Sequence, residues 1–188
     1  KLSGLTGLSL ASNKLLVNAS VIASDIHESH ESGSEHFNMS GYAAPKLDTV
    51  RVGFIGLGQR GPTHLKNMTN LEGVEIKALC DIRPDYVNRA KVSIGGSPEV
   101  YSGSTDAWKK LCDRKDIDLV FIATPWDLHT PMAVYAMKQG KHVCVEVPAA
   151  TTIDECWQLV ETSERTRKYC MMMENCCYDF FELLTLNM

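Results

Sequence analysis

From Val50 to Asn175 the sequence alternates between short apolar, β-branched runs and segments with helical period. This alternation limits the fold more than any other feature of the chain. The runs are almost continuously hydrophobic, which is typical of parallel strands buried on both faces of a sheet. They are VRVGFIG (50–56), VEIKALCD (74–81), DLVFIATP (118–125), KHVCVEV (141–147) and KYCMMMEN (168–175).

The segments between these runs are predicted to be helices, over residues 61–70, 83–94, 104–115, 129–140 and 152–168. Several begin with a helix-start signal, namely Pro84, the pair Ser104/Thr105 and a capping box from Thr152 to Glu155. Gly140 is expected to end the fourth helix in a left-handed conformation. Alternating strands and helices predict an α/β fold, a Rossmann-type doubly wound, mostly parallel sheet with helices on both faces.

Residues 1–48 lack the alternation. The first 24 are small, apolar and interrupted by glycine, and a polar Ser/Gly/His segment follows. We interpret the pair as the remnant of an export leader and its spacer, although a loosely packed arm would have a similar sequence. KLSGLTGLSLAS resembles the part of a twin-arginine signal that follows the paired arginines, which are absent here. We therefore expect export to the periplasm or outside the cell, by the twin-arginine route, and no membrane segment in the mature form.

Charge and cysteine content exclude several classes of function. The net charge of −4 leaves no basic excess with which to bind a nucleic acid. The seven cysteines are odd in number and form no C-x-x-C pair, so neither a zinc site nor a disulfide framework is predicted. His27, His30 and His36 lie in the polar segment, where a solvated tail is favoured over a metal site.

The first strand is followed by a glycine motif. Gly56, Gly58 and Gly61 form G-x-G-x-x-G at the start of a helix, where they allow a tight turn, close backbone approach and close helix–strand packing. Such a loop holds a pyrophosphate on main-chain amides, although a glycine turn without a ligand has the same pattern. Asp81 ends the second strand 20 residues after Gly61, where a carboxylate binds ribose hydroxyls and repels a 2′-phosphate. NAD is thus favoured over NADP. NADP is not excluded, because Arg83 follows two residues after Asp81.

Two further strand ends carry candidate residues. ATPWDLHTPMAV follows the strand at 118–125, at the sheet edge where such folds bind ligands, and would place Trp126 and His129 along a cofactor. A single histidine near a helix start can equally be structural. The run HVCVEV ends at Glu146 with no basic residue beside it.

Together the glycine loop, the CDIRPD strand end, the ATPxxxH turn and the acidic-Pro strand end resemble the Gfo/Idh/MocA superfamily of sugar oxidoreductases. Glucose-fructose oxidoreductase and inositol dehydrogenase belong to that superfamily. Its members typically carry Glu-Lys-Pro where this chain has Glu146, Val147 and Pro148. The lysine assists proton transfer at the sugar hydroxyl, and Val147 has no proton to move.

The Glu-Val-Pro sequence, TPWDLHTPMA and above all MMMENCCYDFFELLTLNM resemble the family 109 glycoside hydrolases, which are NAD-dependent alpha-N-acetylgalactosaminidases. The resemblance runs from about residue 50 to the C-terminus. It implies three parts, namely the leader remnant and flexible linker (1–48), an NAD-binding Rossmann domain (49–174) and the start of a connection (175–188) to a second α/β domain that carries much of the sugar site.

The resemblance also implies roles for individual residues. Glu146 would pack its carboxylate near the nicotinamide, although it could instead cap the helix that starts near Thr152. Tyr178 is the candidate catalytic base, with packing beside Phe180 and Phe181 as the alternative. The implied cofactor-binding set comprises Gly56, Gly58, Gln59, Arg60, Gly61, Asp81, Thr124, Trp126, His129, Glu146, Val147 and Asn175.

Direct hydrolysis of a glycoside uses two carboxylates that flank the bond, and the sequence offers no convincing pair. The resemblance implies a redox route, in which oxidation at sugar carbon 3 permits elimination, water addition and re-reduction by the same NAD. The expected partner is a small-molecule glycoside, and the sequence is compatible with a monomer and with a homo-oligomer. An NAD-dependent sugar dehydrogenase and a non-catalytic NAD-binding module are the alternatives.

Overall fold

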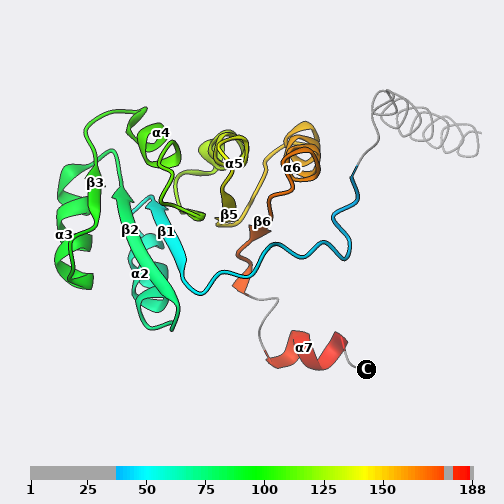
Figure 1. Ribbon diagram of the computed structural model, residues 1–188, viewed down its shortest axis with the longest axis horizontal. Coiled ribbons are helices and arrows are strands. Elements are labelled where there is room, and N and C mark those ends of the chain that lie inside the picture. Colours follow the sequence, from blue (N-terminus) through cyan, green and yellow to red (C-terminus); the bar gives the residue numbers. More distant parts are fainter. Residues whose placement is uncertain (1–36, 176–179, 187–188) are drawn as a thin grey trace, which may run out of the picture. The chain divides into compact units, whose positions relative to one another are not determined.

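The computed structural model describes residues 37–175 and 180–186. Its described part contains a six-stranded sheet, in which every neighbouring pair is parallel, with the strand order β3-β2-β1-β4-β5-β6 (Figure 1). The predicted doubly wound α/β fold is therefore confirmed. The strands are β1 (Val50–Ile55), β2 (Val74–Cys80), β3 (Glu99–Tyr101), β4 (Leu119–Ile122), β5 (His142–Val145) and β6 (Cys170–Met172).

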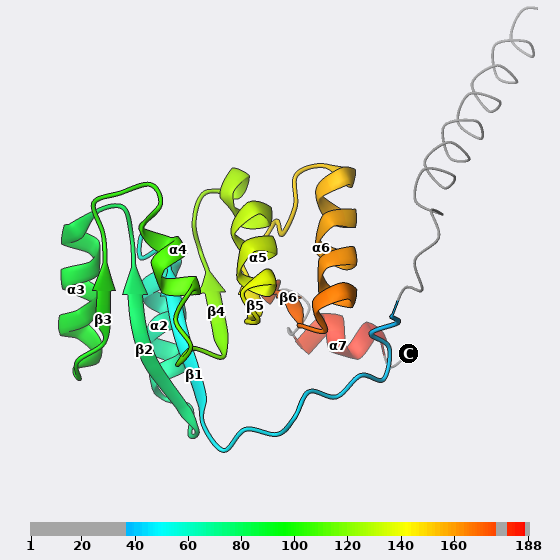
Figure 2. The same ribbon diagram turned by 45° about the horizontal axis from the view of Figure 1, so that its top comes forward.

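Helices cover both faces of this sheet. The helices α4, α5 and α6 pack on one face and α2 and α3 on the other (Figures 1 and 2). A short 3₁₀ helix, η1, directly precedes α5. The bounds are α2 (Gly61–Thr69), α3 (Pro84–Ile94), α4 (Ala107–Cys112), η1 (Trp126–Leu128), α5 (His129–Lys138), α6 (Ile153–Thr166) and α7 (Phe180–Leu186).

The five predicted strands are all present, and β3 is the one that the sequence did not predict. It has three residues at the edge of the sheet, and two of them are exposed. An edge strand this short needs no run of buried apolar residues, so it leaves no hydrophobic pattern to detect.

Most helix ends follow the predicted signals, but the Ser104/Thr105 pair does not start a helix, because α4 begins at Ala107 with Asp106 before it. Thr152 and Glu155 form the capping box of α6, with each side chain accepting a hydrogen bond from the other residue's main-chain N–H. Pro84 occupies the first turn of α3. Gly140 has φ +81° directly after the last residues of α5, as expected of a left-handed helix end.

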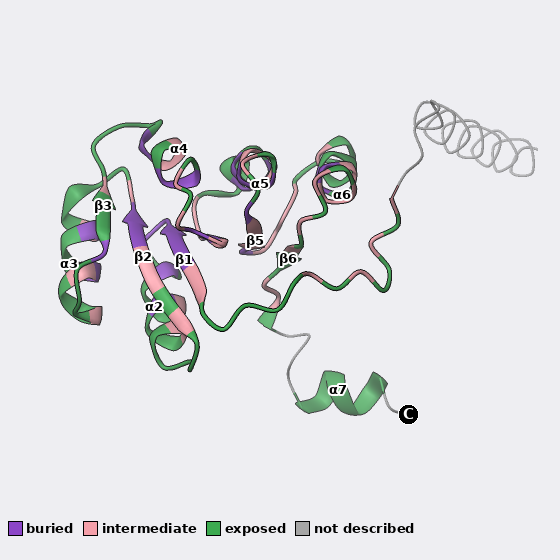
Figure 3. Ribbon diagram, viewed as in Figure 1, coloured by how far each residue is buried: buried purple, intermediate pink, exposed green. Residues whose placement is uncertain are grey.

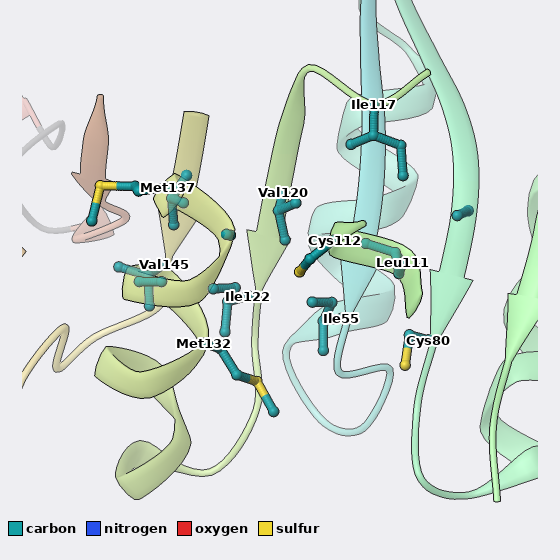
Figure 4. Close-up of a cluster of buried hydrophobic side chains, with 14 of the residues drawn as sticks. Ile55, Cys80, Leu111, Cys112, Ile117, Val120, Ile122, Met132, Met137 and Val145 are labelled. Carbon is teal, nitrogen blue, oxygen red and sulfur yellow. The ribbon is translucent and has the colours of Figure 1, made fainter. Parts of the chain in front are cut away.

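Two hydrophobic clusters hold the layers together, and the buried residues concentrate in the central strands (Figure 3). On the face covered by α4 to α6, Val120, Ile122 and Val145 of the strands meet Leu111 and Met137 of the helices (Figure 4). On the other face, the cluster of α2 and α3 is built on the stacked rings of Phe54 and Phe121, whose centroids are 4.5 Å apart. Burial on both faces explains why the strands are almost continuously apolar.

Residues 37–49 contain no helix or strand. The Tyr169 hydroxyl donates to the main-chain oxygen of Tyr42 and accepts from the N–H of Ala44.

The predicted leader and the histidines at 27, 30 and 36 lie outside the described residues. Within the described part, no helix is long and apolar enough to cross a membrane.

Among the described glycines, Gly56 and Gly61 of the motif leave the least room for a side chain. Gly56 has φ +92°, and a Cβ there would collide with the main-chain oxygen of Ala123, at the end of β4. A Cβ on Gly61 would likewise collide with the main-chain oxygen of Gly56. The loop and the first turn of α2 can therefore approach the sheet this closely only because both positions lack a side chain.

We predict that Gly61→Ala destabilises the protein. The clash is with backbone rather than with a flexible side chain, and overpacking of this kind costs about 1–3 kcal/mol, more than the roughly 1 kcal/mol that alanine gains over glycine inside a helix. Chemical denaturation should show a lower free energy of unfolding. Gly58→Ala is the matched control, because its added Cβ comes no closer than 3.8 Å to Tyr86, and an equal loss for both variants would contradict the packing argument.

Candidate functional site

The principal cavity of the described residues lies at the carboxyl ends of β1, β2, β4 and β5 and measures about 660 Å³. The strand order reverses between β1 and β4, and open parallel sheets bind ligands at that point. The residues that line it are Ile55, Gly56, Gly58, Gln59, Arg60, Cys80, Asp81, Ile82, Arg83, Tyr86, Ser104, Thr105, Trp108, Ala123, Thr124, Pro125, Trp126, Leu128, His129, Met132, Glu146 and Val147.

The glycine loop forms the floor of the cavity between β1 and α2. Gly58 lines the cavity, and the nearest atom to a Cβ built there is on the Tyr86 ring at 3.8 Å, so a ligand can come close to the main chain there. The first residue of α2, Gly61, follows Arg60, whose side chain makes no capping hydrogen bond to the helix. The amides of this helix start are suited to an anion such as a pyrophosphate. Gly61 itself does not line the cavity, because its part in the motif is to pack against Gly56.

Asp81 connects the glycine loop to the residue before α3. Its Oδ2 accepts a hydrogen bond from the N–H of Leu57 at 2.7 Å, and its Oδ1 accepts one from the N–H of Arg83 at 2.9 Å. Each oxygen of an ionised carboxylate can accept a second hydrogen bond. The carboxylate is thus held by main-chain donors at the cavity wall and retains the capacity to accept ribose hydroxyls.

An aromatic and cationic group adjoins Asp81. The guanidinium groups of Arg83 and Arg89 lie over the Tyr86 ring, 4.2 and 4.6 Å from its centroid. Arg83 also donates two hydrogen bonds to the carboxylate of Asp85, at 3.2 and 3.1 Å, and these hold the pKa of Asp85 below its usual range. Arg83 itself lines the cavity, and its guanidinium is bonded to Asp85 and to the Tyr86 hydroxyl.

The turn after β4 contributes Thr124, Trp126 and His129 to the lining. Trp126 is 65% exposed. His129 is buried, and its Nδ1 and Nε2 each lie 2.8 Å from a main-chain oxygen, those of Pro148 and Thr124. The ring therefore joins the turn after β4 to the turn after β5, and a neutral imidazole can donate to one of the two oxygens.

Glu146 directly follows β5, and its buried carboxylate lies in the cavity lining. Its Oε1 contacts Nε2 of His64, in α2, and its Oε2 accepts from the N–H of Val147 at 3.2 Å. Nε of Arg60 lies 3.8 Å from Oε1. The helix that starts near Thr152 is capped by Glu155 and not by Glu146.

Other chemistry at the cavity is limited. Burial raises the pKa of the Cys80 thiol to about 12, so this lining residue stays protonated near neutral pH and is a poor nucleophile. Within residues 37–175 and 180–186, no group of three His, Cys, Asp or Glu residues could hold a metal ion.

The structure brings most of the predicted site residues together in this one cavity. Asn175 is exposed and lies outside the lining. Tyr178 lies outside the described residues, so its role as a base stays a prediction. Sequence reasoning missed His64, Tyr86 and Trp108. His64 could have been found from helical spacing, since it lies one turn beyond Arg60 and Gly61.

Fold and site together define a dinucleotide-binding Rossmann domain. The comparisons agree, because the model of the Gfo/Idh/MocA oxidoreductase family, NAD-binding Rossmann fold, matches residues 50–174. The chain belongs to this family, and NAD is the cofactor of such a domain.

The curated relatives carry a more specific name. Glycosyl hydrolase family 109 protein 1 of Bacteroides fragilis is 60% identical over 152 residues, which cover 79% of this chain and 33% of the relative. An alpha-N-acetylgalactosaminidase of the same species is 56% identical over 152 residues, which cover 79% of this chain and 36% of the relative. The chain thus spans about a third of the length of these relatives.

Among solved structures, myo-inositol 2-dehydrogenase from Lactobacillus plantarum has a TM-score of 0.63 and 27% sequence identity. The match covers 70% of this chain and 38% of the dehydrogenase. The described fold is therefore that of the NAD-binding domain of an oxidoreductase.

We predict that Asp81→Asn weakens NAD binding about tenfold, because hydrogen bonds to a charged acceptor are roughly 1–2 kcal/mol stronger than those to a neutral one. The affinity for NADP should fall less, since the variant no longer repels the 2′-phosphate. Isothermal titration calorimetry with both dinucleotides measures the two effects. Asp127→Asn removes a carboxylate from the neighbouring η1 that does not line the cavity, and it should bind NAD as the wild type does.

Proposed function

We propose that the full-length protein is an NAD-dependent glycoside hydrolase of the alpha-N-acetylgalactosaminidase type, in which this chain is the cofactor domain. The observation that carries the proposal is the strand end Glu146-Val147-Pro148, where a valine lines the cavity and no lysine of the described residues does so. The names of the curated relatives, at 56–60% identity, support it.

The proposed cofactor orientation follows from the chemistry of the lining. The ribose of the adenosine binds at Asp81, which has acceptor capacity and a negative charge. The pyrophosphate binds at Gly58 and the start of α2, with Gln59 and Arg60 beside it. The nicotinamide then extends toward Trp126, Glu146 and Val147, at the other end of the cavity.

NAD, when bound, supplies a reversible hydride acceptor. In the proposed reaction the sugar loses a hydride from carbon 3 and a proton from its 3-hydroxyl, and the resulting ketone acidifies the proton on carbon 2. Removal of that proton expels the aglycone from carbon 1 by elimination. Water adds at carbon 1, carbon 2 regains a proton, and the hydride and proton return to carbon 3, so that the net reaction is hydrolysis.

This route explains why a hydrolase can lack a pair of carboxylates flanking the glycosidic bond. Val147 cannot accept the 3-hydroxyl proton, so another group must do so. We propose Tyr178 for proton transfer at this end of the site, with further groups supplied by the remainder of the longer protein.

A sugar dehydrogenase is the second candidate, because the family to which the chain belongs is named for oxidoreductases. The two functions differ in what accumulates. A dehydrogenase releases an oxidised sugar with one NADH for each turnover, whereas the glycosidase releases aglycone and retains its cofactor in the NAD form.

We predict that the full-length protein cleaves an aryl alpha-N-acetylgalactosaminide without accumulating NADH. In D₂O the released sugar should carry deuterium on carbon 2, because the elimination removes that hydrogen and solvent replaces it. Mass spectrometry and NMR of the product measure the incorporation. Cleavage with hydrogen retained on carbon 2 would contradict the elimination, and NADH formed without released aglycone would favour the dehydrogenase.

We also predict that Val147→Lys does not convert the protein into an efficient sugar dehydrogenase. Restoring a proton-transfer group leaves the substrate in the position that suits elimination, and misplacement by about 1 Å can cost a hundredfold in rate. NADH fluorescence with simple sugars should stay near the wild-type level. Val147→Met, a substitution without an ionisable group, serves as the control, and strong NADH output from the lysine variant alone would refute the prediction.

A further inference from the structure

The contact between His64 and Glu146 joins two elements that are far apart in the sequence. His64 lies in the first turn of α2, the helix that follows the glycine loop, and Glu146 follows the last residue of β5. Their side chains are 17% and 7% exposed. Nε2 of the histidine is in contact with Oε1 of the glutamate.

His64 is the main partner of this carboxylate. A buried carboxylate is costly unless hydrogen bonds or opposite charges compensate it. Arg60 is 3.8 Å away, beyond hydrogen-bond distance, and its side chain is 56% exposed, so solvent screens the attraction. The remaining hydrogen bond comes from the N–H of Val147 at 3.2 Å. Among the described residues, Nε2 of His64 is thus the one side-chain nitrogen within hydrogen-bond distance of this carboxylate, which accepts from it.

The imidazole is itself fixed by the sheet core. Its centroid lies 5.0 Å from that of Phe121, at an interplanar angle of 34°. Phe121 stacks on Phe54 at 4.5 Å, and both are buried. The position of the ring, and with it the position of the Glu146 carboxylate, is therefore set by β1 and β4.

The turn after β5 is held from its other side as well. His129 contacts the main-chain oxygen of Pro148, and the hydroxyl of Thr130 donates to that of Ala149 at 3.0 Å. Residues 146–149 are thus attached to α2 through Glu146 and to α5 through Pro148 and Ala149. Glu146 and Val147 line the cavity at this turn.

We propose that His64 is a positioning residue for the nicotinamide end of the site. By holding the Glu146 carboxylate against α2, it fixes the wall formed by Glu146 and Val147 on which the nicotinamide half of NAD binds. The proposal rests on the cofactor orientation given above and is independent of the glycoside chemistry.

Two variants of the full-length protein separate the hydrogen bond from the packing. His64→Phe keeps a ring on Phe121 and removes the donor, whereas His64→Gln keeps a donor near the position of Nε2 and removes the ring. The ligands are NAD and ADP-ribose, which lacks the nicotinamide. Dissociation constants are measured by isothermal titration calorimetry, with thermal unfolding of each unliganded variant as a check of folding.

We expect His64→Phe to raise the dissociation constant of NAD about tenfold, the scale of one hydrogen bond to a charged group. The dissociation constant of ADP-ribose should stay within about twofold of the wild type, and His64→Gln should restore NAD binding. Equal losses for both ligands would overturn the proposal, because the ring would then support the glycine loop. A glutamine variant as weak as the phenylalanine variant would overturn it too.

Glu146→Met keeps the proposal testable if His64→Phe does not fold. It keeps the length of the side chain and removes the oxygen that His64 contacts, so it should weaken NAD binding and spare ADP-ribose. Unchanged NAD binding in Glu146→Met would refute the proposal. These binding measurements do not depend on glycoside cleavage, so a failure of the proposed hydrolysis would leave their outcome unaffected.

Discussion

The contact of the glycine motif with the sheet is the constraint on which the rest of the site depends. Gly56 lies against the main chain of Ala123 at the end of β4, and Gly61 lies against Gly56. Because both positions lack a Cβ, the glycine loop and the start of α2 can lie close to the ends of β1 and β4. The strand order reverses between these two strands. This arrangement places Gly58 and Arg60 in the cavity lining and brings His64 into contact with Glu146.

Two carboxylates at the cavity are held in different ways. Asp81 is bound by main-chain amides of Leu57 and Arg83 and keeps acceptor capacity toward a ligand. Glu146 is buried and held by a side chain, that of His64. The first arrangement suits recognition of ribose hydroxyls. The second suits the shaping of a wall, since the Glu146 carboxylate is buried and is joined to the side chain of a residue in α2.

The sequence was sufficient to predict five of the six strands in the described sheet, the helices between them and many of the residues that line the cavity, because buried parallel strands and the glycine motif both leave strong local patterns. It could not predict β3, whose edge position needs no apolar run, nor the pairing of His64 with Glu146, which joins residues 82 positions apart. It also placed His129 along the cofactor without showing that both ring nitrogens lie against main-chain oxygens. Long-range polar contacts have no periodic signal in one sequence, so they appear only in the fold.

The central claim is that this domain holds NAD as a cofactor that is recycled within its own site. The most direct measurement is to denature the purified full-length protein and to identify the small molecule released, by its ultraviolet spectrum and mass. The account predicts NAD in near-stoichiometric amount, because a cofactor that is regenerated in each cycle has no need to leave. Protein that releases no dinucleotide, and that takes up none when NAD is added, would contradict it.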